Sequence, residues 1–496
     1  MALILASIVT IVLLSCLIHS LFFKSKTKNL PPGPKGFSII ANLHLLKKFG
    51  HRDLHKLSQT YGPIMHMKLG LKSTIIVSSP NVAKLFLKTH EPNFSNRPIP
   101  LTSNQMSYNR KNIAFVDLGS YWQTMRKICS SHLLTSSKVN SFSSIRRQEL
   151  GLLVDRLQEA ARNHAIVDLS SQVSSLTFDV ICVMLFGKKF VDKELTVAIR
   201  EGTFLSGVPN LGDFIPFIAF LDLQGLCRRA KAINKVVDGF LDMIIEERPE
   251  FKDQNKTDKD GFFVDVMLDL TRSQEIEHQI DRSNVKAVLF DLMIGGVDSS
   301  STTIIWALSE IIKHPQVMKK IQEELQQVVG LNKMVEESHL NQLKYLDMTI
   351  KETLRIHPPI PLIPRKSIQD CNVNGYHIPK NTDIMINDWA IGQDPSYWTE
   401  PQKFNPDRFV DSQIDFIGNN NNFEMLPFGF GRRGCPGMQL GLVMVRLIVA
   451  QLVHCFDWEL PNGVLPSELD MSEESFGLTC PRAQNLRVVP ICRVCI

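Results

Sequence analysis

Residues 427–437 constrain this chain more than any other stretch, because they place four glycines and two prolines around a single cysteine. Glycine can adopt backbone conformations that are closed to residues with a Cβ, so the main chain here can approach a large flat ligand and direct N–H groups at the sulfur of Cys435. A helical pattern begins at Met438, and the positive end of that helix favours an anion and lowers the thiol pKa. Arg433 adds a cation beside the sulfur. The stretch predicts a cradle for a thiolate; the alternative is a glycine-rich turn with a buried, inert cysteine.

The residue types in this loop favour the thiolate. Five of them resemble, position for position, the haem-binding signature of the cytochrome P450 family: Phe428, Gly431, Arg433, Cys435 and Gly437. The resemblance implies that these residues surround haem b (iron protoporphyrin IX), that Cys435 is the axial ligand of its iron, and that Arg433 pairs with a propionate. A thiolate ligand pushes electron density onto the iron and favours O–O cleavage.

The composition is that of a globular chain with a large core. Of its 496 residues, 44% are hydrophobic and 21% are charged, and length alone favours more than one domain. Ten scattered cysteines give no disulfide framework, and Cys492 and Cys495 have no second pair with which to form a zinc site. A net charge of +5 without a basic run argues against nucleic-acid binding and is compatible with a membrane surface or an acidic partner.

The N-terminal stretch is apolar. Residues 2–23 contain no Asp, Glu, Lys or Arg, and a helix of this length spans about 30 Å of hydrocarbon. We therefore expect a single transmembrane anchor over residues 1–23; a cleaved signal peptide would need a basic start and a small-residue cleavage site. Lys24, Lys26 and Lys28 follow and place the rest of the chain in the cytosol, which suits the endoplasmic reticulum membrane.

The remainder of the chain predicts a hinge and one catalytic domain. Residues 24–36 are basic and then rich in proline, which fixes φ and lacks an amide donor, so they form a stiff spacer. Residues 37–496 are mainly helical in period with small β-sheets, an α+β class, and the resemblance implies the cytochrome P450 fold. Residues 96–117 have no clean period and predict a loop. Short strands are expected in three runs: 74–77, 371–378 and 383–387.

Two arginines outside the cysteine loop also match the family. Trp122 and Arg126 are four residues apart on one face of a predicted helix, which alone indicates only a surface helix with a half-buried tryptophan. In the family that the chain resembles, this spacing borders the haem propionates, and Arg365 resembles another propionate-pairing arginine. The resemblance places four apolar side chains against substrate: Ile360, Leu362, Ile363 and Phe476.

The longest helical pattern, over 283–314, is weakened in its middle. Gly295 and Gly296 are each unfavourable there by roughly 1 kcal/mol relative to alanine. They indicate either a kink or close helix crossing, or a groove for oxygen and a proton-carrying water. The resemblance favours the groove, places both glycines beside the haem and gives Asp298 and Ser299 catalytic roles. Ser299 stands where the family has threonine, which keeps the hydroxyl but predicts poorer coupling of electrons to product, or chemistry other than simple hydroxylation.

A third motif concerns structure. Glu352 and Arg355 are three residues apart on a predicted helix and form a weak pair if exposed. The family joins such a pair to a later arginine, here Arg408, in a buried network. Removing one partner would leave a buried charge uncompensated.

Together the motifs imply a plant microsomal monooxygenase of specialised metabolism. It would take NADPH electrons through NADPH-cytochrome P450 reductase and insert one atom of O2 into a small lipophilic terpenoid, alkaloid or phenolic. Two other classes stay open: a reductase-independent haem-thiolate isomerase or dehydratase, and a non-catalytic haem-binding membrane protein. The intact Asp298–Ser299 pair and cysteine loop argue against both.

Overall fold

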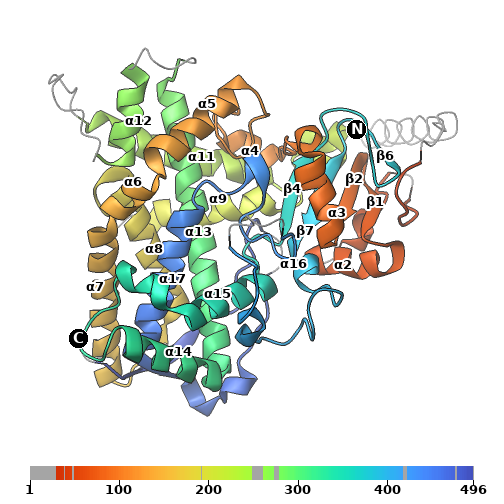
Figure 1. Cartoon of the computed structure of the whole chain (residues 1–496). Helices are drawn as coiled ribbons and strands as arrows, with labels where there is room; N and C mark the ends of the chain where they lie inside the picture. The colour runs from red at the N-terminus through yellow and green to blue at the C-terminus, as the bar shows by residue number, and fades with distance from the viewer. Residues whose placement is uncertain are drawn as a thin grey trace, which may run out of the picture.

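Helices outnumber strands in the residues that the computed structural model describes (Figure 1). The predicted anchor, Phe476 and Cys495 lie outside the described residues. The predicted fold class, mainly helical with small sheets, is confirmed for the rest. The described ranges are 29–37, 39–46, 50–190, 193–248, 261–272, 279–416, 422–474 and 477–494.

A four-stranded sheet forms one side of the molecule (Figure 1). β1 (Ile64–Leu69) pairs antiparallel with β2 (Lys72–Val77), and β2 pairs parallel with β7 (Asp383–Asn387) from the C-terminal half. β4 (Leu362–Lys366) completes the sheet beside β7. β2 ends in a run of four buried β-branched residues, and β7 buries Ile384 and Ile386, as expected for central strands.

The described residues also form two smaller sheets. β5 and β6 form a hairpin, and β9 lies between β3 and β8. The predicted strand regions are confirmed. The bounds are β3 (Val167–Asp168), β5 (Cys371–Val373), β6 (Tyr376–Ile378), β8 (Phe456–Glu459) and β9 (Arg487–Cys492).

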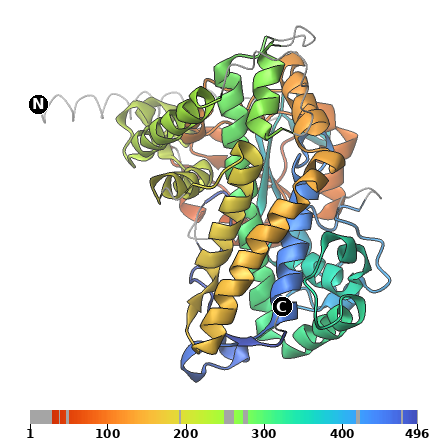
Figure 2. The same cartoon turned by 90° about the vertical axis from the view of Figure 1, so that its left-hand side faces the viewer.

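The helix α13 (Arg282–Lys313) runs through the middle of the helical part (Figure 1). Asp281 starts it with a capping box shared with Asn284, and Pro315 follows its end. It packs against α8 (Leu169–Phe186), α15 (Lys344–Ile356) and α17 (Met438–Cys455). Figure 2 shows the long gold helices beside blue α17.

The described residues form further helices. They are α2 (Gly50–Tyr61), α3 (Pro80–Lys84), α4 (Leu101–Met106), α5 (Ser120–Ile128), α6 (Ser136–Ser141), α7 (Ser143–Arg162), α9 (Lys193–Gly207), α10 (Leu211–Phe214), α11 (Leu226–Glu246), α12 (Phe263–Arg272), α14 (Pro315–Val328) and α16 (Asp388–Gly392). Short π-helical turns extend α3 and α5 at Leu85–Thr89 and Cys129–Leu133. Short 3-10 turns occur at Leu43–Leu45, Glu91–Phe94, Pro216–Leu221, Glu337–Gln342, Pro406–Phe409, Gly431–Arg433, Pro461–Gly463 and Pro466–Glu468.

The predicted loop over 96–117 is partly wrong, because it contains α4. This helix buries polar side chains instead of an apolar stripe: Thr102 is fully buried and donates a hydrogen bond from Oγ1 to the carbonyl of Leu205, 2.9 Å away. A pattern of apolar residues could not reveal a helix that is held by hydrogen bonds to its neighbours.

Three described helices are apolar and long enough to cross a membrane. In α8, α13 and α17, 61%, 61% and 72% of the apolar stretch is nevertheless buried inside the fold. Their hydrophobicity is therefore explained by their burial in the core of the fold.

Candidate functional site

An internal cavity of about 360 Å³ lies where α13, α17 and β4 meet the loop that precedes α17. It brings together most residues that the sequence analysis selected. Asp298, Gly431 and Leu362 do not line it. The selected residues on its wall are Trp122, Arg126, Gly295, Gly296, Ser299, Ile360, Ile363, Arg365, Phe428, Arg433, Cys435 and Gly437.

The cysteine loop folds back on itself beside the cavity. Gly429 and Gly431 adopt φ of 68° and 71°, which a residue with a Cβ rarely takes, so two of the four glycines are needed for conformation. The amide of Cys435 donates to the carbonyl of Phe428 at 2.8 Å, and Gly434 N donates to Gly431 O at 2.9 Å. These bonds fix the position of Cys435, whose side chain is accessible only because it borders the cavity inside the protein.

The charge on this sulfur is decided by burial. Burial raises the pKa of the Cys435 thiol, and the amide of Gly437 together with Arg126 and Arg97 offsets part of the rise. The predicted lowering by the helix end is therefore wrong in sign for the chain alone, because desolvation of the thiolate outweighs the nearby dipole. A thiolate at this position requires a cation bound to it, as a metal ion provides.

Buried guanidinium groups gather on the same cavity. Arg433 donates to the carbonyls of Ser95, Ile113 and Val116, at 2.8, 3.2 and 2.6 Å. Its guanidinium lies 4.4 Å from the centre of the Trp122 ring. These acceptors are neutral, so they satisfy the N–H groups but leave the charge uncompensated.

Arg97 is a member of this group that sequence reasoning missed. Its two terminal nitrogens donate to the carbonyls of Ala114 and Arg433, at 3.0 and 3.1 Å, while its Nε is buried without a hydrogen-bond partner. Burial and the repulsion of Arg97 lower the pKa of Arg433 to about 9, and burial, Arg97 and Arg433 lower the pKa of Arg365 far below its usual range. A ligand carrying carboxylates would supply the missing negative charge.

The two glycines of α13 have different surroundings. A Cβ on Gly296 would lie 2.8 Å from Cδ1 of Ile181 in α8, whereas a Cβ on Gly295 would meet nothing within 4 Å. Gly296 thus permits a close helix crossing, and Gly295 keeps the cavity open. Ser299 donates from Oγ to Gly295 O at 2.7 Å, so its hydroxyl stays on the cavity side.

Asp298 reaches the cavity only through another residue. Its carboxylate accepts a hydrogen bond from the hydroxyl of Thr479, and Thr479 lines the cavity. Burial raises the pKa of Asp298, and the bond from Thr479 and the charge of Arg200 offset part of the rise. Thr479 was not selected from the sequence, although it directly follows the predicted turn that contains Phe476.

Leu362 is a correction to the predicted substrate contacts. Leu362 and Ile363 are successive residues of β4, so their side chains point to opposite faces of the sheet. Ile363 lines the cavity, while Leu362 packs on the other side against the cluster that contains Met65 and Ile76.

The predicted network around Glu352 is present and buried. Arg355 donates from Nε and Nη2 to the two carboxylate oxygens at 2.7 and 2.8 Å, and Arg408 Nε donates to Oε1 at 2.8 Å. Arg355 also donates to the carbonyls of Gly392 and Pro401, at 2.6 and 2.7 Å. The network ties α15 to the loops that follow α16 and does not line the cavity.

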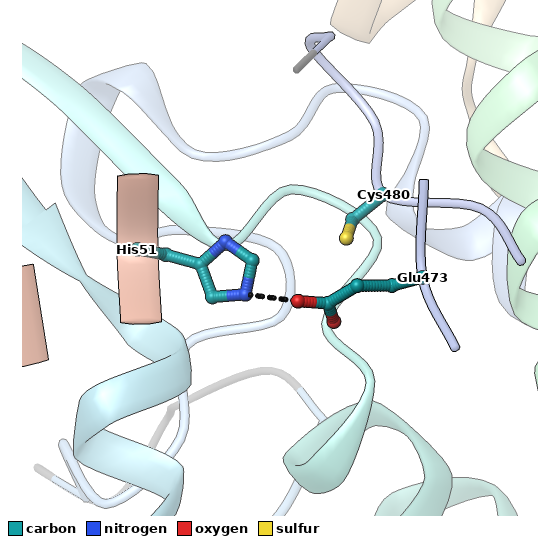
Figure 3. A group of neighbouring side chains, drawn as sticks. All are labelled: His51, Glu473 and Cys480. Carbon is teal, nitrogen blue, oxygen red and sulfur yellow. Dashed lines mark ion pairs between the residues drawn. The ribbon is translucent and has the colours of Figure 1, made fainter. Parts of the chain in front are cut away.

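A second group of possible metal ligands lies elsewhere (Figure 3). One ligand atom from each of His51, Glu473 and Cys480 lies within 4.8 Å of the others, and all three residues are enclosed by protein. Glu473 already pairs with His51 at 3.1 Å and with Arg52 through two bonds of 2.5 and 2.9 Å, which hold its pKa at about 2. Because the Arg52 guanidinium already compensates this carboxylate, the group ties α2 to the C-terminal loop without a metal.

Comparisons with known proteins agree with this geometry. The cytochrome P450 family model matches residues 31–486. Cytochrome P450 CYP736A12 of Panax ginseng is 45% identical over 469 residues, 93% of each chain. Flavonoid 3'-monooxygenase CYP75B137 of Crocosmia x crocosmiiflora is 37% identical over 504 residues, 98% of this chain and 97% of its own. A solved zebra fish cytochrome P450 structure superposes with a TM-score of 0.74 at 25% identity, covering 89% of this chain and 99% of the other.

Proposed function

This chain belongs to the cytochrome P450 family, and on that premise we propose that Cys435 holds the iron of haem b and that the adjoining cavity holds a small lipophilic metabolite. The chain is a cytochrome P450 monooxygenase, and the family requires a haem-thiolate cofactor, a redox partner and a substrate. The observation that carries the proposal is the convergence of a cysteine thiol and buried guanidinium groups on one cavity.

The chemistry of the donor set fits this cofactor. Cys435 offers a sulfur that needs a bound cation to become a thiolate. Arg97, Arg365 and Arg433 offer charge that needs carboxylates, and Arg97 Nε has no partner among the described residues. Haem b carries both an iron and two propionates, so it satisfies both needs. We propose Trp122, Arg126, Arg365 and Arg433, with Arg97, as the propionate side of the site.

The protein's part in the reaction is to hold protons and exclude water. Haem with a thiolate ligand supplies the activation of O2. Ser299 keeps its hydroxyl at the cavity wall, where its oxygen can accept one hydrogen bond while it donates another. Asp298 has a raised pKa and touches Thr479, so this pair can take up a proton and pass it to the cavity. We propose Ser299 and Asp298 as the proton-handling residues and Thr479 as the link between Asp298 and the cavity.

The cavity wall favours an apolar substrate. Side chains such as Ile181, Phe290 and Leu478 line it, and the hydroxyls of Thr203 and Ser206 are occupied by helix carbonyls at 3.0 and 2.8 Å. Few polar groups therefore remain to bind a hydrophilic molecule. One relative is named a flavonoid 3'-monooxygenase. We propose a plant specialised metabolite of terpenoid, alkaloid or phenolic type, with Ile360, Ile363 and Phe476 among its contacts.

The exterior supports attachment to a membrane. Large apolar side chains are exposed on two neighbouring segments, which meet where Leu71 N donates to Phe214 O at 2.8 Å. Phe220 is 83% exposed. Other exposed apolar side chains in this region are Phe37, Ile40, Leu71, Leu211, Phe217, Leu221 and Leu223. An apolar surface of this kind favours contact with lipid.

We propose that this surface rests on the endoplasmic reticulum membrane. In this arrangement residues 1–23 are the anchor, residues 24–36 are the hinge, and residues 37–496 lie in the cytosol. The electron donor would be NADPH-cytochrome P450 reductase in the same membrane.

The test uses the full chain with that reductase and NADPH. The reduced, carbon-monoxide-bound protein is expected to show the long-wavelength Soret band of sulfur ligation, and a panel of lipophilic plant metabolites is expected to yield NADPH-dependent oxygenated products. Cys435→Ser should lose the band, and Cys371→Ser, which changes a cysteine outside the cavity, should keep it. Absence of the band from folded wild-type protein would refute the haem-thiolate site. Product formation without NADPH would instead support an isomerase or dehydratase.

A further inference from the structure

The segment 112–116 lies between α13 and the arginines of the cavity. Its peptide N–H groups face a carboxylate on α13, and its carbonyl groups face the guanidinium groups. The segment belongs to the region without sequence periodicity and forms neither helix nor strand. Hydrogen bonds from the groups on its two sides, together with the burial of Ile113, hold it in position.

Asp291 holds the first side. Its Oδ2 accepts hydrogen bonds from the amides of Ile113 and Ala114, at 2.7 and 3.0 Å, and its Oδ1 accepts one from Nδ2 of Asn112 at 3.0 Å. Three donors on one carboxylate make a strong anchor, because hydrogen bonds to an ionised group are about twice as strong as neutral ones.

The carbonyls of the same segment hold the arginines. Ile113 O accepts from Arg433 Nη1 at 3.2 Å and from Trp122 Nε1 at 3.2 Å. Ala114 O accepts from Arg97 Nη1 at 3.0 Å, and Val116 O accepts from Arg433 Nη2 at 2.6 Å. A shift of this segment would move three carbonyls that orient two guanidinium groups.

We propose that Asp291 is a positioning residue for the cofactor: by fixing residues 112–116 it sets the guanidinium groups of Arg97 and Arg433 toward the haem propionates. This inference rests on the proposed haem site and goes beyond it, because Asp291 acts through the segment and not on the reaction. Its negative charge also favours the charged state of Arg97. The three protein donors occupy most of the acceptor sites of the Asp291 carboxylate.

The experiment compares variants of the full-length holoenzyme. Asp291→Asn keeps the size but loses the charge, and Asp291→Glu restores the charge. Glu310→Gln is the matched control, because Glu310 is a buried carboxylate on the same helix that pairs with His357 and His314, away from the cavity. Two quantities are measured: the rate of haem transfer to excess apomyoglobin, and hydrogen exchange of peptides that contain residues 112–116.

Asp291→Asn is expected to release haem about tenfold faster than wild type and to exchange the amides of Ile113 and Ala114 faster. Asp291→Glu should recover much of the difference, and Glu310→Gln should match wild type in both measurements even if its melting temperature falls. Combining Asp291→Asn with Arg97→Gln should speed haem release by less than the two single effects together, because Arg97 is one of the two guanidinium groups that the segment orients.

Three results would overturn the proposal. They are a folded Asp291→Asn variant that keeps haem as well as wild type, an equal effect of Glu310→Gln, and full additivity with Arg97→Gln. If Asp291→Asn does not fold, Asn112→Ala takes its place; it removes one donor to Asp291, and unchanged haem release would equally refute the proposal. Failure of the wild-type protein to bind haem through sulfur would refute the proposed function itself, so the two failures are distinguishable.

Discussion

At the scale of single residues, burial controls the charge of the groups around the cavity. It raises the pKa of Cys435 and Asp298, and it lowers the pKa of Arg365 and Arg433. Each of these shifts disfavours the charged form of the group. The site therefore favours a ligand that brings both positive and negative charge, because such a ligand stabilises the charged forms of these groups.

Ser299 provides a test of proton delivery. The Ser299 side chain lacks the methyl group that restricts χ1 rotation in threonine, so its hydroxyl can leave the Gly295 carbonyl more easily than a threonine hydroxyl would. Ser299→Thr is expected to raise the fraction of NADPH electrons that appear in product. Ser299→Ala should lower product per NADPH by at least about tenfold, because a positioned proton donor is lost. The measurement is NADPH consumed against product formed; equal ratios in all three proteins would contradict the role.

Asp388 provides a test of buried charge outside the cavity. Burial raises its pKa to about 7, and its Oδ1 accepts a hydrogen bond from Leu426 N at 2.8 Å, which asparagine can retain. The folded protein keeps the carboxyl protonated up to a higher pH than the unfolded chain does. Wild-type stability therefore falls relative to Asp388→Asn as pH rises from about 4 to about 7.

We expect Asp388→Asn to be more stable than wild type by roughly 2–4 kcal/mol at pH 8 and by much less at pH 5. Chemical denaturation at the two pH values measures the difference. A gap that is the same at both would mean that the charge of Asp388 is not the cause.

At the scale of elements, two adjacent glycines of α13 have different roles. Gly296 lets α8 approach, and Gly295 leaves space in the cavity. α13 is a continuous helix through both positions. The two glycines therefore serve packing and cavity shape without breaking the helix.

The neighbouring glycines make a matched pair of substitutions. Gly296→Ala should destabilise the protein by about 1–3 kcal/mol, because the new methyl would force Ile181 to move and the overpacking exceeds the gain in helix propensity. Gly295→Ala should stabilise it by up to about 1 kcal/mol but reduce substrate binding, since its methyl enters the cavity. Thermal unfolding and substrate-induced spectral titration separate the two effects; equal stability changes would contradict the assignment.

At the scale of the whole molecule, distant parts of the chain meet at the cavity. β2 and β7 pair across the two halves of the sequence, and Glu473 joins the C-terminal loop to α2. This loop carries Thr479 and continues to Cys480, whose amide donates to Pro359 O at 2.9 Å. The ion pair at Glu473 therefore helps to position a cavity wall from outside the cavity.

Glu473→Gln tests this connection. The substitution leaves His51 and Arg52 without their carboxylate. We expect the free energy of unfolding to fall by about 1–3 kcal/mol at neutral pH; this figure is discounted for solvent screening, because the Arg52 side chain is 40% exposed. The pKa of Glu473 is about 2 when folded and near 4.5 when unfolded, so its contribution is present above about pH 4.5 and is lost as pH falls toward 2. Melting temperatures of both proteins from pH 7 to pH 2 should converge at the acidic end. A constant difference would contradict the ion-pair explanation.

The sequence by itself determined the local structure of this protein. Glycines with positive φ shape the cysteine loop, Pro315 marks the end of α13, and a β-branched run gives β2. These features depend on steric limits and periodicities within a few neighbouring residues. The same knowledge of strand alternation could have separated Ile363 from Leu362.

Only the tertiary structure decided which groups converge. Arg97 and Thr479 come from segments without a distinctive pattern, and Asp291 comes from a helix whose pattern does not single it out; all three matter because folding brings them to one cavity. It also decided the direction of the pKa shift of Cys435, since desolvation depends on everything that surrounds the sulfur and not on its neighbours in the chain. Burial and electrostatic contacts between distant residues are properties of the packed chain, which is why no local pattern encodes them.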